Sequence, residues 1–214
     1  MADRLRIFGL LPFRGLSDPK TRLGTVLPPA ARGHLALELL RQAVDAMLAG
    51  GVERLAVITL DERLTRAGLD PRAEVIVQHG RGLNAAVHEG QAWAMLGGAD
   101  GLLTVLPDLP LFSSDDVRAL LSSATTEGAV IAPDRHGLGT NALLLSPPDA
   151  IPPSFGVDSA PRHRLALALA DIPVTDIQRP GTHLDLDTPD DFDLFSRESG
   201  FGNWESGKVD VVAR

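Results

Sequence analysis

Short apolar runs alternate with segments of helical periodicity along almost the whole chain, and this alternation limits the fold more than any other feature. Strands are predicted at residues 4–11, 55–60, 74–78, 101–106, 130–132, 142–145 and 174–177. Helices are predicted at residues 35–48, 85–96, 113–121 and 159–170, and a last helix opens at 188–191. Strands that alternate with helices predict an α/β fold in which helices cover both faces of a mostly parallel sheet.

The length of the chain suits a single domain. Its 214 residues, of which 44% are hydrophobic and 22% charged, fit one ordinary globular core and are few for two. We therefore expect one domain over residues 1–200. Residues 201–214 show no clear periodicity and are interpreted as a C-terminal tail.

Charge and composition exclude several classes of protein. The net charge of −8 argues against a general binder of nucleic acid or of membrane surfaces. No apolar stretch is long enough to cross a bilayer and no signal sequence is recognised, so we expect the protein in the cytoplasm. The lack of cysteine excludes disulfides, thiolate metal sites and cysteine nucleophiles. The oligomeric state stays open, a homodimer included.

Three aspartates stand at or near the ends of apolar segments, where parallel sheets bind their ligands. Asp108 follows the strand at 101–106 directly, between two prolines. Asp185 and Asp187 alternate with leucines, so both point to one face if this segment ends a strand. Neighbouring carboxylates repel unless a cation lies between them, and Mg²⁺ is held by a few carboxylates plus substrate phosphates. The simpler alternative is that Asp108 stabilises a turn and that Asp187 or Thr188 caps the last helix.

The loop at residues 12–23 carries three cations, Arg14, Lys20 and Arg22. Lys20 and Arg22 would lie over the edge of the sheet, where they could neutralise the charge of a triphosphate and of a leaving pyrophosphate. The Gly-x-x-x-x-Gly-Lys pattern of a Walker loop is missing, so phosphates would be held in another way. A solvated charged loop is the alternative interpretation.

A glycine-flanked turn at residues 80–84 precedes the second helix. Gly82 would let the backbone approach a ligand closely, and the main chain and amide of Asn84 would be available to the edge of a base. Such turns occur in many proteins, so this one supports an assignment that depends on other residues.

Two further loops of small residues lie in the second half of the chain, at 137–141 and 155–159. Both offer backbone N–H groups and hydroxyls to a carboxylate or phosphate, and the second also opens a helix. Arg162 and Arg164 add positive charge to that helix. His163 between them is interpreted as a surface or packing histidine without a role in proton transfer.

These segments together resemble the phosphoenolpyruvate / 2-phospho-L-lactate guanylyltransferase family of coenzyme F420 biosynthesis. The resemblance spans residues 5–196 and depends on the order and spacing of short motifs: Lys20-Thr21-Arg22-Leu23, Gly82-Leu83-Asn84-Ala85, Pro107-Asp108-Leu109-Pro110, Ala132-Pro133-Asp134, Gly139-Thr140-Asn141-Ala142, Phe155-Gly156, Asp158-Ser159 and Asp185-Leu186-Asp187-Thr188-Pro189. One position departs from the family pattern, because Arg14 stands where a lysine is usual. Arginine keeps the charge but changes its geometry.

The resemblance implies a single-domain, GT-A-like nucleotidyltransferase fold, with GTP as donor and two Mg²⁺ ions as cofactors. It implies Asp108, Asp185 and Asp187 as metal ligands, and Thr140, Gly156 and Ser159 as contacts of the acceptor acid. The expected catalytic residues are Lys20, Arg22 and Asp108, and the expected nucleotide contacts are Arg14, Lys20, Arg22, Gly82 and Asn84.

The expected reaction transfers GMP from GTP to a phosphorylated three-carbon acid and releases pyrophosphate. A phosphomonoester is mostly ionised at pH 7, so its oxygen can attack without a general base. The acceptor is left open between phosphoenolpyruvate, 2-phospho-L-lactate and 3-phosphoglycerate, and phosphoenolpyruvate is favoured because the Ala-, Arg- and Leu-rich composition suggests a GC-rich bacterial source. The alternatives are another nucleotidyltransferase of this fold, such as a molybdopterin guanylyl- or cytidylyltransferase, and a catalytically silent nucleotide-binding module.

Overall fold

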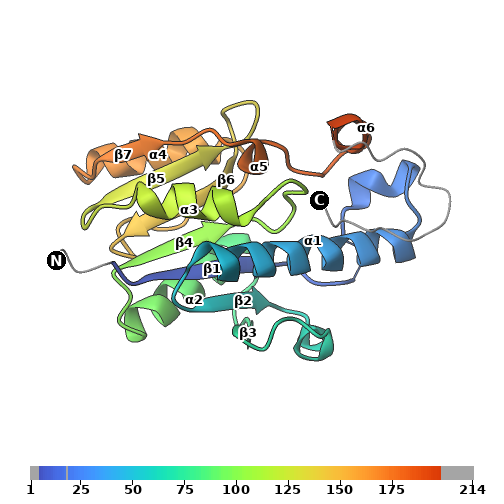
Figure 1. The fold of residues 1–214 in the computed structure, drawn as a ribbon, viewed down its shortest axis with the longest axis horizontal. Helices are drawn as coiled ribbons and strands as arrows, with labels where there is room; N and C mark the ends of the chain where they lie inside the picture. Colours follow the sequence, from blue (N-terminus) through green and yellow to red (C-terminus); the bar gives the residue numbers. More distant parts are fainter. Residues whose placement is uncertain (1–4, 18, 199–214) are drawn as a thin grey trace.

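The computed structural model describes residues 5–17 and 19–198, and a seven-stranded sheet forms its centre (Figure 1). The strands are β1 (Ile7–Phe13), β2 (Leu55–Thr59), β3 (Ala73–Val77), β4 (Gly101–Val105), β5 (Gly128–Pro133), β6 (Thr140–Ser146) and β7 (Val174–Asp176), in the spatial order β3-β2-β1-β4-β6-β5-β7. Each of them overlaps a predicted strand, which confirms the predicted α/β architecture.

The sheet is mostly parallel and contains one reversed strand. β1 pairs in parallel with β2 and β4, β2 with β3, and β5 with β7, whereas β6 runs antiparallel to both β4 and β5. The short connection between β5 and β6 explains the reversal, because a few residues suffice for a hairpin but not for a parallel crossover. The reversal brings the start of β6 beside the end of β4.

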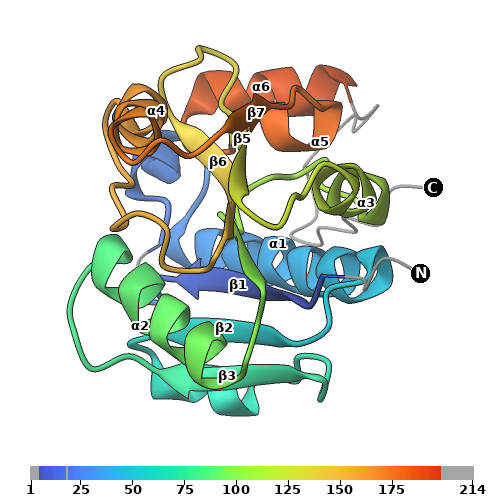
Figure 2. The same cartoon turned by 90° about the vertical axis from the view of Figure 1, so that its left-hand side faces the viewer.

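Helices cover both faces of the sheet (Figure 2). One face carries α1 (Pro29–Gly50) and α3 (Ser114–Ser122), and the other carries α2 (Leu83–Leu96) and α4 (Ser159–Leu169). The shorter α5 (Pro180–His183) and α6 (Pro189–Glu198) follow β7, and two 3-10 helices, η1 (Thr21–Thr25) and η2 (Glu62–Arg66), follow β1 and β2. As predicted, α1 stops at a glycine pair, and α3 begins with a capping box between Ser113 and Asp116.

Two cores lie on the two faces of the sheet. Successive residues of β1 alternate between them: Leu11 belongs to the core under α1 and α3, and Leu10 to the core under α2 and α4. Both side chains are fully buried. Strands buried on both faces explain why the sequence shows continuous apolar runs here.

A third, smaller core lies beyond the sheet, where η1 and α6 meet the first turns of α1. Leu23 of η1, Phe195 of α6 and Leu186 of the extended segment before α6 are buried in it. This core joins the basic loop at 12–23 to the acidic segment at 184–187, although the two are far apart in the chain.

The segment at 184–187 differs from its prediction in one respect. It is extended, but it pairs with no strand in the part of the chain that the structure describes. Leu184 and Leu186 are nevertheless buried while Asp185 and Asp187 are half-buried, so the expected alternation of faces is present.

The helices η1, η2 and α5 were not predicted, because elements of four or five residues carry no measurable periodicity. The predicted tail at 201–214 lies outside the described residues. Among the helices of the described part, none has both the length and the apolar character needed to cross a membrane.

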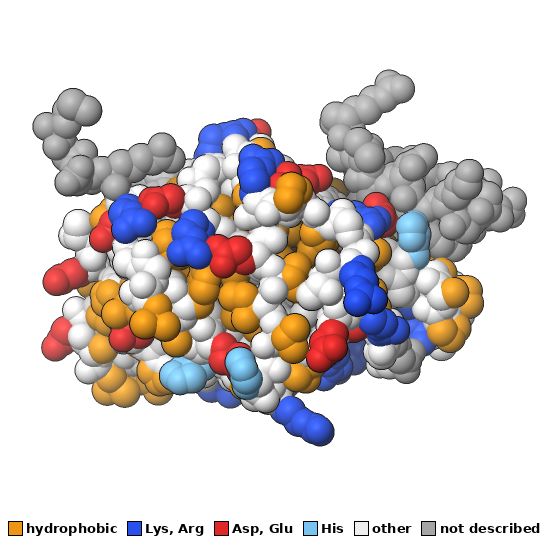
Figure 3. Space-filling view, turned by 90° about the horizontal axis from the view of Figure 1, so that it is seen from below, with side chains coloured by type: hydrophobic (Ala, Val, Ile, Leu, Met, Phe, Trp, Pro, Cys, Tyr) orange, Lys and Arg blue, Asp and Glu red, His pale blue; other side chains and the backbone are white. Residues whose placement is uncertain are grey.

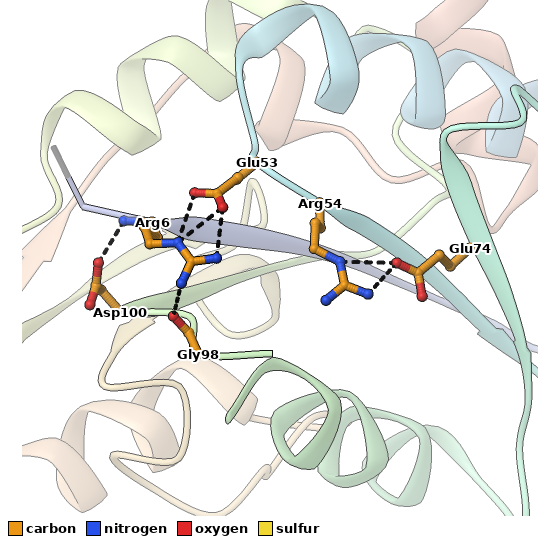
Figure 4. A network of polar contacts seen from close by, with 6 residues as sticks. All are labelled: Arg6, Glu53, Arg54, Glu74, Gly98 and Asp100. Atoms are coloured by element: carbon orange, nitrogen blue, oxygen red, sulfur yellow. Dashed lines mark hydrogen bonds and ion pairs between the residues drawn. The ribbon is translucent and has the colours of Figure 1, made fainter. Parts of the chain in front are cut away.

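A polar network links the N-terminal ends of β1, β2 and β4 (Figure 4). The guanidinium of Arg6 donates to the Glu53 carboxylate, with Nη2 to Oε1 at 2.8 Å, and to the Gly98 carbonyl at 2.8 Å. Arg54 pairs with Glu74, with Nη2 to Oε1 at 2.6 Å. This network closes the end of the sheet opposite the carboxyl ends of its parallel strands.

Candidate active site

A cavity of about 490 Å³ opens at the carboxyl ends of β1, β2 and β4. β1 lies between β2 and β4: the chain runs from β1 outward to β2 and β3, and then returns past β1 to β4. Such a reversal of strand order is a switch point, where open α/β sheets bind ligands. The lining comes from the residues at and after the ends of β1, β2, β3 and β4, from α1 and α2, and from the acidic segment. Its residues are Pro12, Phe13, Arg14, Gly15, Pro19, Lys20, Ala36, Leu60, Gln78, Gly82, Leu83, Ala86, Leu106, Pro107, Asp108 and Asp187.

The structure brings two of the three predicted carboxylates, Asp108 and Asp187, to this cavity, whereas Asp185 is not part of its lining. Asp108 follows β4 after Leu106 and Pro107, and its main-chain oxygen accepts a hydrogen bond from the Leu186 N–H at 3.0 Å. That bond holds the segment from Asp185 to Asp187 against the end of β4. Asp108 and Asp187 both line the cavity.

The ammonium of Lys20 lies between two of these carboxylates. Its Nζ is 3.4 Å from Oδ1 of Asp187 and 3.8 Å from Oδ2 of Asp108, and it donates to the Leu186 carbonyl at 2.8 Å. The Lys20 side chain is 8% exposed, and its backbone adopts the left-handed conformation with φ of 51°. A non-glycine residue in this conformation is uncommon and directs attention to the site.

The carboxylates carry more negative charge than one lysine balances. Burial, followed by the nearby Asp108, raises the pKa of Asp185 to about 6. Burial also raises the pKa of Asp108, against the opposing effect of Lys20. Oδ1 of Asp108 is buried and has no hydrogen-bond partner among the described residues. A buried, unpartnered carboxylate oxygen beside two further acids is the environment that a hard cation stabilises.

These acids do not form a complete metal cage by themselves. Within residues 5–17 and 19–198, no three His, Asp or Glu side chains are arranged as a ready-made metal cluster. A cation here would therefore take part of its coordination from a substrate, as Mg²⁺ does with phosphates.

A second ionic network anchors the acidic segment from behind. Oδ2 of the buried Asp191 accepts from the backbone N–H groups of Asp187 and Thr188, at 3.1 and 2.7 Å. Its Oδ1 lies 2.6 Å from Nη2 of Arg135, in the connection between β5 and β6. Thr188 and Asp191 also form the capping box of α6, which confirms the capping expected of Thr188. The anchoring role of Arg135 and Asp191 was not predicted, although the spacing Thr188-x-x-Asp191 is a capping signal.

The three predicted cations of the first loop occupy different places. Arg14 lines the cavity beside Lys20, whereas Arg22 lies on η1 and is exposed. Neither makes an ion pair with another described residue. The buried Arg32 of α1 holds this loop by donating to the carbonyls of Pro19 and Leu27, both at 3.1 Å.

The glycine turn before α2 lies at the cavity, and the amide of Asn84 bonds the main chain of the loop at 155–159. Gly82, with φ of 92°, lines the cavity, and its carbonyl accepts from Nε2 of Gln78 at 2.9 Å. Both ends of the Asn84 amide bond the main chain of Phe155: Oδ1 accepts from its N–H at 2.7 Å, and Nδ2 donates to its carbonyl at 3.1 Å. The amide therefore ties the turn to the loop at 155–159, and one N–H of Nδ2 and one lone pair of Oδ1 are left for further contacts.

The predicted acceptor contacts gather next to the cavity rather than in its lining. Thr140 and Ser159 are buried, and the Ser159 N–H donates to the carbonyl of Gly156 at 3.1 Å. Gly156 has φ of 114°, in the region that favours glycine. His163 is fully buried between Thr140 and the loop, so it is a packing histidine and not a surface one.

Positive and negative side chains are unevenly distributed on one face of the molecule. In the space-filling view from below, acidic and basic side chains are scattered among hydrophobic and uncharged ones (Figure 3). Several Lys and Arg side chains lie together towards the right-hand end, the end at which the parallel strands finish. Positive charge is thus local, as a site for phosphates requires.

Several solved structures share this fold, among them a nucleotidyl transferase. A Desulfovibrio desulfuricans G20 structure assigned to the nucleotide-diphospho-sugar transferases matches with a TM-score of 0.78 and 19% identity, covering 97% of this chain and 92% of that one. A Methanothermobacter nucleotidyl transferase matches with a TM-score of 0.64 and 18% identity, over 90% and 99% of the two chains. A Mycobacterium tuberculosis protein in complex with manganese matches with a TM-score of 0.56 and 18% identity, over 88% and 97%. At identities below 25%, these matches show the fold: the chain has the α/β fold of these structures.

Comparison of sequences shows that the chain is a nucleotidyltransferase and identifies its family. The family model "Guanylyl transferase CofC like" matches residues 7–191, and the chain belongs to this family. A phosphoenolpyruvate guanylyltransferase of Rubrobacter xylanophilus is 40% identical over 198 residues, covering 92% of this chain and 96% of the relative. A 3-phospho-D-glycerate guanylyltransferase of Colwellia psychrerythraea is 29% identical over 188 residues, covering 87% and 90%.

Proposed function

We propose that the protein is a cytoplasmic guanylyltransferase that moves GMP from GTP onto a phosphorylated three-carbon acid and releases pyrophosphate, as a step of coenzyme F420 biosynthesis. The observation that carries the proposal is the convergence of Asp108, Asp187 and Lys20 at one cavity beyond the parallel strands. Acids and a lysine at a switch-point cavity suit a reaction between two polyphosphate or phosphate anions. Relatives that carry guanylyltransferase names support the nucleotide and the acceptor class.

The proposed chemistry needs charge neutralisation and alignment rather than a general base. An oxygen of the acceptor phosphate attacks the α-phosphorus of GTP, the bond to the bridging oxygen of the β-phosphate breaks, and pyrophosphate leaves. The attacking oxygen is already ionised at pH 7, because the second pKa of a phosphomonoester is near 6. Lys20 and Arg22, helped by Arg14, would neutralise the triphosphate and the leaving group.

A divalent cation, proposed as two Mg²⁺ ions, fits the acids of this site. The unpartnered Oδ1 of Asp108 and the raised pKa of Asp185 mark a place that lacks positive charge. Asp108, Asp185 and Asp187 would hold the ions, which when bound would neutralise the reacting phosphates and keep their oxygens in line. The manganese complex of the Mycobacterium protein supports a divalent cation in this fold.

For the acceptor we favour phosphoenolpyruvate, the acid named for the Rubrobacter relative. Thr140, Gly156 and Ser159 are proposed as its contacts. 3-Phosphoglycerate, named for the Colwellia relative, and 2-phospho-L-lactate differ from it by a few atoms. A different base or acceptor within the same class remains the competing function.

Pyrophosphate release tests the proposal. The protein is incubated with each of the four nucleoside triphosphates, with each of the three acids in turn, and with and without Mg²⁺. We expect release with GTP, phosphoenolpyruvate and Mg²⁺ together, and little when any one is left out. Preference for CTP, or no release with any of the acids, would refute the proposed function.

The site assignment is tested separately by substitution. Asp108→Asn and Asp187→Asn should lower turnover by about 100-fold or more, because each removes a charge aimed at the reacting phosphates. Asp193→Asn, at an exposed position of α6, is the matched control and should leave turnover unchanged. Near-normal turnover of Asp187→Asn would contradict the assignment.

A further inference from the structure

A β-bulge decides where the Thr140 side chain points. β5 and β6 are paired at Ala132 and Ala142, but the next pair is Pro133 with Thr140, so Asn141 is an extra residue in β6. A bulge of this kind shifts the alternation of side chains by one residue. Asn141 then donates from Nδ2 to the carbonyl of Thr182 in α5, at 3.0 Å, while Thr140 turns to the other face of the sheet, towards α4.

On that face, Thr140 meets His163. Oγ1 of Thr140 lies 3.0 Å from Nδ1 of His163, and Nε2 of the same ring accepts from the Ser154 N–H at 3.3 Å. The ring also makes an edge contact with Phe155, with centroids 4.9 Å apart. His163 is 0% exposed and therefore joins β6, α4 and the loop before α4 from within.

These contacts assign the tautomer of His163. A backbone N–H can only donate, so Nε2 must be the unprotonated nitrogen of the ring. A neutral imidazole has one N–H, which must then be on Nδ1 and must donate to Oγ1 of Thr140. Burial, and after it the charge of Arg162, lowers the pKa of His163 to about 4, so the ring is neutral at pH 7.

The direction of this bond determines what Thr140 can do. Because Oγ1 accepts from His163, the hydroxyl proton must point elsewhere, and among the described residues no acceptor for it is found. The register between β4 and β6, extended by the bond from the Leu106 N–H to the Asn141 carbonyl at 2.9 Å, brings Thr140 level with Pro107, next to Asp108. The backbone of Thr140 therefore lies beside the end of β4, and its buried hydroxyl has a proton to donate.

We propose that His163 is a positioning residue: it makes the Thr140 hydroxyl an obligate donor to the anionic acceptor acid and holds the loop at Ser154 and Phe155 in place for the same ligand. This inference rests on the proposed function, because it deepens the assignment of the acceptor subsite. An oxygen that accepts hydrogen bonds, as in a carboxylate or phosphate, would be favoured at Thr140 over a hydroxyl group. Arg162 and Asn84 support the same loop from outside, through the carbonyl of Ser154 and the main chain of Phe155.

The tautomer is tested without any activity measurement. Nitrogen-15 NMR of the wild-type protein at pH 7, with His163 assigned by comparison with His163→Gln, distinguishes protonated from unprotonated ring nitrogens. We expect Nδ1 protonated and Nε2 unprotonated. The opposite tautomer, or a doubly protonated ring, would overturn the proposal.

The effect on the acceptor is tested by separating the KM values of the two substrates. Thr140→Val keeps the shape but removes the hydroxyl, and should raise the KM for the acid by about 10- to 100-fold with little change in the KM for GTP. Thr140→Ser should restore most of the affinity. His163→Gln, which lacks a donor at the Nδ1 position, should resemble Thr140→Val, whereas His163→Asn, which keeps one, should lie closer to the wild type.

His88→Gln, at an exposed position of α2, is the matched control and should change neither KM. An unchanged KM for the acid in Thr140→Val or in His163→Gln, in a wild-type enzyme that forms product, would overturn the proposal and leave the proposed function intact. If the wild type forms no product with any acid, the proposed function fails instead. If the His163 variants do not fold, Thr140→Val and the NMR measurement still decide the question.

Discussion

Burial governs the behaviour of the ionisable side chains at the scale of single residues. His163 and Asp185 both lose water on folding, but the consequence has opposite sign for a base and an acid. The imidazole of His163 is driven to its neutral form, whereas the carboxyl of Asp185 retains its proton to a higher pH. The two groups therefore affect stability in different pH ranges.

The depressed pKa of His163 predicts a loss of stability on mild acidification. The unfolded chain binds a proton at this ring below about pH 6.5, whereas the folded protein resists it down to about pH 4. The free energy of unfolding contributed by this group is therefore complete above pH 6.5 and is lost as the pH falls from there towards 4. Urea denaturation between pH 4 and 7 should show a shallower slope against pH for His163→Gln than for the wild type. His88→Gln should keep the wild-type slope, and equal slopes for His163→Gln and wild type would refute the prediction.

The sequence identified the charged residues of the site better than their partners. Asp108 and Asp187 could be located because a strand end and an acid-leucine alternation are local patterns. The partner of Asn84 could not be found, because Phe155 is 71 residues further along the chain. The contact between Thr140 and His163 could not be predicted either, because it depends on a β-bulge that no residue type in the sequence indicates.

At the scale of secondary-structure elements, local chemistry sets the ends of helices and long-range packing sets their neighbours. The capping box of α3 and the glycine stop of α1 are where the sequence indicates. The extended segment before α6 pairs with no strand among the described residues, and its position follows instead from Arg135, Asp191 and the small core around Leu186. The sequence therefore indicated that this segment is extended, but not which residues hold it.

The anchor of the acidic segment leads to a prediction for α6. Asp191→Asn removes a buried charge that pairs with Arg135 and caps the helix, so we expect a loss of stability of about 2–4 kcal/mol. Catalytic turnover should fall as well, because Asp187 loses its backbone anchor. Chemical denaturation and pyrophosphate release measure the two effects. Asp193→Asn, two residues away and exposed, should show neither, and a stable Asp191→Asn would disprove the anchoring role.

Two glycines of α1 should respond in opposite directions to the same substitution. A Cβ at Gly50 would overlap the buried Val117 of α3, so Gly50→Ala should destabilise the protein by about 1–3 kcal/mol. A Cβ at Gly33 would lie 3.7 Å from the nearest atom, the Leu16 carbonyl oxygen, which is ordinary contact. Gly33→Ala should therefore stabilise the helix by up to about 1 kcal/mol. Thermal unfolding of both variants tests the pair, and equal shifts would contradict the close packing of α1 on α3.

On the scale of the whole molecule, the candidate active site and a stabilising polar network lie at opposite ends of the sheet. The cavity lies at the carboxyl ends of the parallel strands, and the network of Arg6 and Arg54 closes the other end (Figures 1 and 4). The alternating pattern of the sequence predicted the layers of this architecture. It could not predict the reversed β6, because the length of one connection rather than any strand pattern decides the direction.

This separation predicts a substitution that changes stability alone. Arg54 pairs with Glu74 and lies over the rings of Trp93 and Phe8, at 5.1 and 5.2 Å from their centroids. Arg54→Met should lower the stability by about 1–2 kcal/mol, since an exposed ion pair and a cation–π contact each contribute modestly. The kcat/KM for both substrates should not change. A loss of activity at a temperature where the variant is fully folded would show that the two ends of the sheet are coupled.

The position of the Lys20 ammonium between two carboxylates affects the order in which ligands bind. The protein carries a tethered counter-ion of its own, so a free divalent ion would have to displace it from two carboxylates. An ion that binds together with a triphosphate brings additional negative charge. The ammonium of Lys20 can pair with that charge when the ion displaces it from the carboxylates. Donor and metal are therefore expected to enter as one complex, with Lys20 exchanging one anionic partner for another.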